Sequence, residues 1–158
     1  MLIVLVCIQF IRPTKNKSAN ASPNDITSHY DIPDSVLSVL KKSCYDCHSN
    51  NTIYPWYFNI QPVAWWMADH INEAKDNLNF SEFRSYKAKK QIKKLHGVAS
   101  LVEKKKMPLD SYLWIHKYAK LDEAQIKLVV DWSKALQAKI SADSNVVVVF
   151  KDEKKEKD

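Results

Sequence analysis

Glycine is almost absent from this chain, with one residue among 158, and cysteine and methionine occur only three times each. Sheet proteins rely on glycine for hairpins and tight turns, so its scarcity argues against a β-sandwich or barrel. Long hydrophobic runs are missing too, because the apolar run at residues 2–11 is shorter than the roughly 20 residues that a spanning helix needs. We therefore predict an all-α protein, with room for one domain and its appendages.

Two of the cysteines lie in the stretch Cys44-Tyr45-Asp46-Cys47-His48. Cys-x-x-Cys-His is the pattern at which a haem is attached covalently to protein. On a helix with about 100° per residue, Cys44, Cys47 and His48 share one face. Two thiols there can add to the vinyl groups on one porphyrin edge while the imidazole reaches the iron. The motif predicts one covalent haem c, bound through Cys44 and Cys47, with His48 as the proximal ligand.

Zinc, a redox dithiol and a chance match are the alternatives to haem. Zinc usually takes four ligands, commonly from two such pairs, and the third cysteine, Cys7, lies in an apolar leader. A thioredoxin-like dithiol needs a preceding strand, whereas the residues before Cys44 have helical spacing. An accidental match is expected roughly 0.002 times in a chain with three cysteines and five histidines. The pattern favours haem.

Met107 is the predicted distal ligand of the iron. Pro108 ends the preceding helical pattern and holds Met107 on an extended loop, from which a thioether can reach the metal. Methionine with histidine is the usual axial pair of cytochromes c. His70 is the main rival, since it shares an apolar helical stripe with Met67, a weaker candidate. The choice between Met107 and His70 stays open, and minor candidates are His96 and His116.

The chain divides into four predicted segments: a signal or membrane anchor at 1–12, a linker at 13–31, a haem-binding domain at 32–141, and a charged tail at 142–158. Within the domain we expect a first helix that carries the motif and a helix from Pro62. A helical stretch at 83–102 follows, which Gly97 can split. A last helix, with a capping box formed by Asp122 and Gln125, is expected to close the core against the first helix.

Positive charge is concentrated in one part of the chain, whose formal net charge is +6. Between residues 83 and 106 there are nine basic residues against the single acid Glu103. A solvated helix face is one interpretation, and a surface that docks acidic redox partners is the other. No zinc finger or aromatic-interleaved basic motif points to nucleic acid, which we do not expect as a partner. The basic residues are Arg84, Lys87, Lys89, Lys90, Lys93, Lys94, Lys104, Lys105 and Lys106.

The region 32–133 resembles the small c-type haem-binding domain family of exported bacterial proteins. The resemblance is carried by the motif with Ser49 and Asn50, by the segments 54–57, 62–65, 78–82 and 107–109, and by the pattern of 121–132. It implies a cytochrome-c-like helical fold, with haem attached through Cys44 and Cys47, and with His48 and Met107 as axial ligands. Haem is attached to Cys-x-x-Cys-His on the outer side of the bacterial cytoplasmic membrane, so we expect a periplasmic location, anchored to that membrane by the N-terminal segment. The short leader is where the chain departs from the family.

The predicted function is electron transfer by a monohaem c-type cytochrome rather than catalysis. A haem closed on both sides by protein ligands keeps its geometry in both redox states, and Met107 would close it. A peroxidase-like enzyme needs a displaceable sixth ligand and a distal acid and base, which the sequence does not reveal. A haem-based sensor or ligand-binding module is the other alternative, although no output domain is recognisable.

Overall fold

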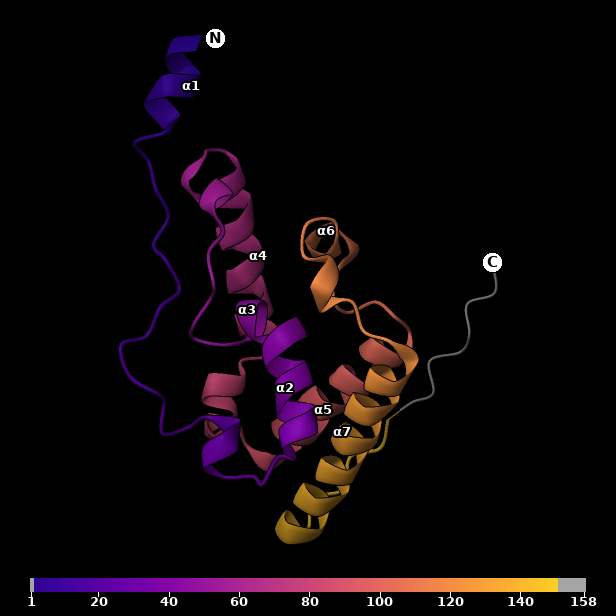
Figure 1. Cartoon of the computed structure of the whole chain (residues 1–158). Coiled ribbons are helices and arrows are strands. Elements are labelled where there is room, and N and C mark those ends of the chain that lie inside the picture. The colour runs from indigo at the N-terminus through magenta and orange to yellow at the C-terminus, as the bar shows by residue number, and fades with distance from the viewer. Residues whose placement is uncertain (1, 151–158) are drawn as a thin grey trace.

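Helices and their connections make up the whole of the computed structural model, which describes residues 2–150 (Figure 1). The α-helices are α1 (Leu2–Ile8), α2 (Asp34–Ser43), α3 (Tyr45–His48), α4 (Val63–Asn77), α5 (Ala88–Glu103), α6 (Asp110–Leu113) and α7 (Glu123–Ser144). Short 3-10 helices join them: η1 (Ile26–Ser28), η2 (Trp56–Asn59), η3 (Phe80–Ser85) and η4 (Lys117–Ala119). Between residues 2 and 150 the only β-pairing is one isolated bridge. The predicted all-α fold is confirmed.

The hydrophobic core lies between α2, α5 and α7, each of which has apolar residues at helical spacing. Phe80 and Phe83 of η3 complete it, and both are almost fully buried. We expected α7 to close the core against the first helix. It does touch α2, but its most extensive packing is along α5 (Figure 1).

The first helix is interrupted within the motif, where a continuous helix was expected. Cys44 has φ −126° and ψ −39°, so α2 ends at Ser43 and α3 begins at Tyr45. The backbone N–H groups of Cys47 and His48 both donate to the Cys44 carbonyl, at 3.2 and 2.9 Å. The motif is therefore a separate helical turn, which orients His48 independently of α2.

Gly97 does not split the fifth helix, which runs unbroken from Ala88 to Glu103. Glycine costs a helix interior about 1 kcal/mol relative to alanine. Burial of several apolar side chains on the same helix outweighs that cost, since burying one such side chain contributes about 1.5–3 kcal/mol. These side chains are Ile92, Leu95, Ala99 and Val102.

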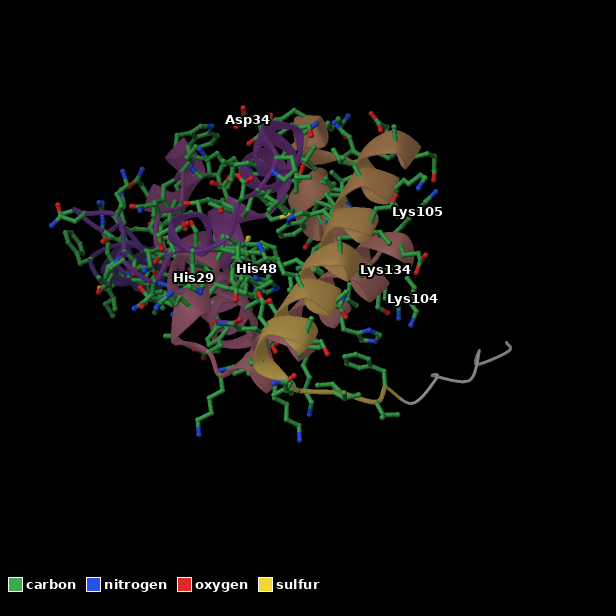
Figure 2. The ribbon with its side chains drawn as sticks, turned by 90° about the horizontal axis from the view of Figure 1, so that it is seen from below. His29, Asp34, His48, Lys104, Lys105 and Lys134 are labelled. Carbon is green, nitrogen blue, oxygen red and sulfur yellow. The ribbon has the colours of Figure 1, made fainter. Side chains whose placement is uncertain are left out.

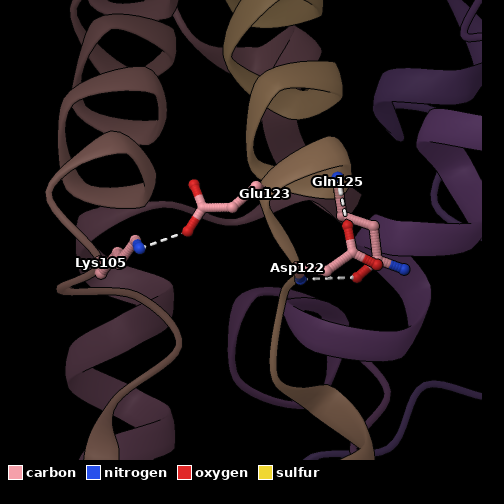
Figure 3. A network of polar contacts seen from close by, with 4 residues as sticks. All are labelled: Lys105, Asp122, Glu123 and Gln125. Carbon is pink, nitrogen blue, oxygen red and sulfur yellow. Dashed lines mark hydrogen bonds and ion pairs between the residues drawn. The ribbon is translucent and has the colours of Figure 1, made fainter.

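The start of α7 has the capping box predicted from the sequence. The Asp122 carboxylate accepts from the Gln125 backbone N–H at 2.8 Å, and the Gln125 side chain accepts from the Asp122 N–H at 3.2 Å (Figure 3). Glu123 forms an ion pair with Lys105, just beyond the end of α5. The beginning of α7 is thereby tied to the end of its main packing partner.

Segments outside the predicted domain pack on it. Residues 13–31 were interpreted as a linker, yet Ile26 is completely buried in the core, and the Asn16 side chain donates to Ser49 and Thr52. Val146, Val148 and Phe150 of the predicted tail also pack against the core. The charged residues 151–158 of that tail lie outside the described range. The proposed domain boundaries stay predictions.

Helix α1 is tied to the start of α4. The Gln9 and Gln61 residues exchange two hydrogen bonds, and the Ile11 carbonyl accepts from the side chains of Gln61 and Trp65. The apolar residues 2–6 of α1 are exposed. None of the helices between residues 2 and 150 is long and apolar enough to cross a bilayer.

Candidate functional site

A cavity of about 570 Å³ brings together three of the four predicted haem-binding residues: Cys44, His48 and Met107. Cys47 is on the same turn as His48 but is not among the residues of the cavity wall. The volume lies within the range of small-molecule and cofactor sites, about 300–1,000 Å³. The wall is formed by residues 43, 44 and 48, by residues 70, 73, 74, 77 and 78 of α4 and its end, by Phe80, by residues 93, 94, 97, 98, 101 and 102 of α5, and by 107–109 and 121.

The His48 imidazole is prepared to be a ligand. Its Nδ1 lies 2.9 Å from the Leu78 carbonyl oxygen and 3.1 Å from that of Ala74. Carbonyl oxygens only accept, so Nδ1 carries the proton and Nε2 keeps its lone pair. Burial lowers the pKa of His48, against the opposing effect of these two hydrogen bonds. The ring is thus held neutral, and Figure 2 shows it among the helices, away from the lysines at the edge.

The hydrogen-bond acceptors of His48 are not where the sequence suggested. Cytochromes commonly orient the haem histidine through a hydrogen bond to a backbone carbonyl of the following loop, and the sequence predicts that carbonyl near Pro55 or Pro62. Ala74 and Leu78 provide it instead. The Ala74 carbonyl also accepts from the Leu78 N–H at 2.8 Å, and Leu78 follows directly after the end of α4. The sequence does locate the end of α4, but not which other element meets it.

Cys44 and Cys47 are free thiols and are largely shielded from solvent. Burial, and secondarily the neighbouring Cys47, raises the pKa of Cys44 to about 12. Burial, and secondarily Asp46, raises the pKa of Cys47 to about 11. Both thiols are therefore protonated at neutral pH in the folded chain, which is unlike the low pKa of a reactive redox dithiol.

Met107 reaches the cavity from a turn that follows α5. The backbone N–H groups of Lys106 and Met107 both donate to the Leu101 carbonyl, at 2.8 and 3.3 Å, and Lys105 adopts a left-handed conformation with φ 55°. This turn directs the half-buried Met107 into the cavity wall. Met107 and His48 thus enter one cavity from different elements, the end of α5 and the turn α3.

His70 also lines the cavity, but from the same helix that orients His48. Its Nδ1 is 2.9 Å from the Trp66 carbonyl, which leaves Nε2 with a lone pair. It lies one turn before Ala74, whose carbonyl accepts from His48. His70 is therefore a residue of the wall on the His48 side, whereas Met107 comes from elsewhere.

The other candidate ligands are engaged outside the cavity. The His96 ring stacks on Phe150 with centroids 3.7 Å apart, and the His116 ring stacks on Tyr112 at 4.2 Å. Met67 is on α4 but is not part of the cavity wall. Of the residues considered as the second ligand of the iron, Met107 and His70 are therefore the two that line the cavity.

The lining of the cavity suits a largely apolar group. Gly97, the only glycine of the chain, lies in the wall, and a Cβ at this position would meet no atom within 4 Å. The α5 backbone is consequently bare toward the cavity, and the wall residues of α5 that follow Gly97 are all apolar: Val98, Leu101 and Val102. A porphyrin face can pack directly on such a surface, with the neutral His48 beside it.

Asp46, the residue between the two cysteines, fixes the surroundings of the motif. Its carboxylate accepts from the Tyr112 hydroxyl at 2.7 Å and from the Ile53 N–H at 3.1 Å, and its carbonyl accepts from Thr52 at 2.7 Å. Helix α6 is thereby attached to α3. No local sequence pattern indicates this contact, since Tyr112 lies far from the motif along the chain.

The zinc alternative has no support in the geometry, because residues 2–150 contain no cluster of three or more His, Cys, Asp or Glu side chains suited to a metal ion. No curated protein and no solved structure matches the chain. The family model described as haem-binding domain matches residues 3–135, a span that includes the motif and the whole cavity wall. The chain belongs to the haem-binding domain family.

Proposed function

We propose that this protein is a monohaem c-type cytochrome that transfers electrons and is not an enzyme. The observation that carries the proposal is the shared cavity, in which the bare Nε2 of His48 and the thioether of Met107 come from different elements. Haem supplies an iron that cycles between the ferric and ferrous states. His48 and Met107 would both hold the iron in either redox state, which would keep the rearrangement that accompanies electron transfer small.

Cys44 and Cys47 would attach the haem covalently. Each thiol adds its S–H bond across one vinyl group, so that sulfur bonds to one carbon and the proton goes to the other. The addition needs no external oxidant or reductant.

Intact-protein mass spectrometry tests covalent binding. After export from a host with haem-maturation machinery, the protein should be heavier than its polypeptide by one haem. The Cys44→Ala/Cys47→Ala variant should have the mass of the bare polypeptide, and Cys7→Ala, which removes the exposed third cysteine, should retain the haem. A wild-type mass equal to that of the polypeptide would contradict the proposal.

A haem-based sensor or a peroxidase-like enzyme is the second candidate, and His70 is the observation that favours it. A second imidazole in the cavity wall would give the iron an alternative ligand to a displaceable Met107. Near-infrared absorption distinguishes the two cases. The methionine-to-iron charge-transfer band should disappear in Met107→Ala and persist in Met67→Ala and His70→Ala. Absence of the band from the wild-type protein would favour the second candidate.

The proposed location is the periplasmic side of the cytoplasmic membrane, with α1 as part of an anchor. The support is the exposed apolar face of α1 and its attachment to α4 through Gln9 and Gln61. Carbonate extraction of membranes, compared with a variant lacking residues 2–8, tests the anchor: only the full chain should stay with the membrane.

The proposed partners are acidic redox proteins that dock on the lysine-rich α5.

A further inference from the structure

Two lysines line the cavity that is otherwise mainly apolar. Lys93 and Lys94 of α5 belong to its wall, and Glu73 of α4 is the other side chain there that ordinarily carries a charge. Both lysines also border a shallow hollow formed with Lys87, Lys89 and Lys90. Along α5 the two lysines are the first residues of the cavity wall, so this end of the wall borders the hollow lined by lysines.

Neither Lys93 nor Lys94 forms an ion pair with another residue of the described range 2–150, where the pairs involve Lys105, Lys127 and Lys134. Lys94 is half-buried, and burial together with the charge of Lys90 lowers its pKa. Partial burial of an ammonium group without a counter-charge costs free energy. An anion bound at this end of the cavity would offset that cost.

We infer that Lys93 and Lys94 bind the two propionate carboxylates of the haem, an inference that rests on the proposed haem site. A haem is amphiphilic: its ring is apolar, and its carboxylates leave from the edge remote from the vinyl groups. The cavity has the same character, with Cys44 and apolar side chains along its wall and two lysine side chains where α5 first contributes to that wall. Within residues 2–150 these are the only lysines or arginines in the wall.

The charge of these lysines has two consequences for a bound haem. A positive charge near the iron favours the ferrous state, so its removal lowers the reduction potential. An adjacent ammonium also lowers the pKa of a propionate, and removing it raises that pKa. The reduction potential changes with pH in the range where a propionate titrates. Removing the ammonium group should therefore move this pH-dependent change of the potential to higher pH.

The experiment is a spectroelectrochemical titration of the haem-loaded protein across a range of pH. Lys93→Gln/Lys94→Gln should lower the midpoint potential and move its inflection to higher pH. The conservative variant Lys93→Arg/Lys94→Arg should restore both values. The matched control Lys87→Gln/Lys89→Gln removes the same charge from the same helix outside the cavity wall, and should change the potential much less.

Equal shifts of the midpoint potential in the two glutamine variants, or no shift in either, would overturn the inference. The lysines would then act only as general surface charge. If Lys93→Gln/Lys94→Gln does not load haem, resonance Raman spectra of the wild-type and arginine proteins replace the comparison. The propionate bending bands should respond to the lysine-to-arginine change, and identical bands would contradict the contact. Failure of the haem proposal itself is distinguishable, because the wild-type protein would then contain no haem to titrate.

Discussion

Gly97 presents bare α5 backbone to the cavity, and an added side chain there would project into open space. Alanine is better than glycine in a helix by about 1 kcal/mol, so Gly97→Ala should stabilise the haem-free chain. Gly97→Leu should occupy the space that the haem needs and lower haem loading several-fold. The ratio of Soret to protein absorbance measures loading. Ser100→Leu, on the same helix outside the cavity wall, is the control, and equal loading of the two leucine variants would contradict the assignment.

Glu82 is a carboxylate whose pKa is set by hydrogen bonds. Its two oxygens accept from Asn50 at 2.8 Å and from Asn24 at 3.2 Å. Burial raises the pKa of Glu82, but the hydrogen bonds from Asn24, Ser22 and Asn50 and the charge of Lys75 outweigh it, so the net pKa is lowered. A carboxyl with a lowered folded-state pKa stabilises the protein above its unfolded pKa, about 4.3. That contribution is lost as the pH falls through the folded-state pKa.

Glu82→Gln should therefore reduce the acid dependence of stability. Wild-type protein should lose more free energy of unfolding between about pH 7 and about pH 3.5 than the variant does. Urea unfolding at the two pH values measures the difference. Asp69→Asn, which removes an exposed carboxylate from α4, is the control and should leave the acid dependence close to that of wild type. An unchanged acid dependence in Glu82→Gln would show that this carboxyl is not the one responsible.

Residues with a local signal could be predicted from the sequence, and residues defined by tertiary contacts could not. Asp122 and Gln125 were recognised because a capping box is complete within four positions. Cys44, His48 and Met107 were proposed from spacing and from Pro108, and the cavity brings them together. The carbonyl of Leu78 was missed because nothing local specifies which element approaches His48.

Helix α6 is held over the motif by one strong contact, the hydrogen bond from Tyr112 to the Asp46 carboxylate. A hydrogen bond to a charged group typically contributes about 1.5–3 kcal/mol, so Tyr112→Phe should weaken this attachment by an amount of that order. Amide hydrogen exchange in residues 110–119 should become faster. Tyr30→Phe, which removes another 2.7 Å hydrogen bond, to Gln91, is the control and should not affect α6 selectively. Equal exchange rates at α6 in wild type and Tyr112→Phe would contradict this role.

At the scale of elements, periodicity located the long helices but not their interruptions or their neighbours. The apolar stripe of α5 was visible, and the single glycine was an ambiguous signal because packing decides whether a helix continues through it. The break at Cys44 had no breaker residue to announce it. The packing of Ile26 was hidden by the polar sequence around it, since one buried side chain produces no period.

The charges of the whole molecule are compensated unevenly. At the end of α5, Lys105 pairs with Glu123, and nearby Lys134 pairs with Glu103 (Figure 2). Toward its beginning, Lys87, Lys89, Lys90, Lys93 and Lys94 border one hollow, and none of them forms an ion pair within residues 2–150. A negative partner should therefore be attracted more to the beginning of α5 than to its end.

Ferricyanide, a small anionic oxidant, can test this distribution by stopped-flow oxidation of the reduced protein. Attraction between opposite charges speeds association at low salt and is screened when the Debye length shortens, from about 30 Å at 0.01 M to about 10 Å at 0.1 M. The second-order rate constant should therefore fall with ionic strength. Lys87→Glu/Lys89→Glu should reduce the low-salt rate and flatten the salt dependence, while Lys105→Glu/Lys134→Glu, with the same charge change at the other end, should have a smaller effect. If the rate constant depends on ionic strength equally in the two variants, only the net charge of the protein matters. The beginning of α5 would then be no preferred route to the haem.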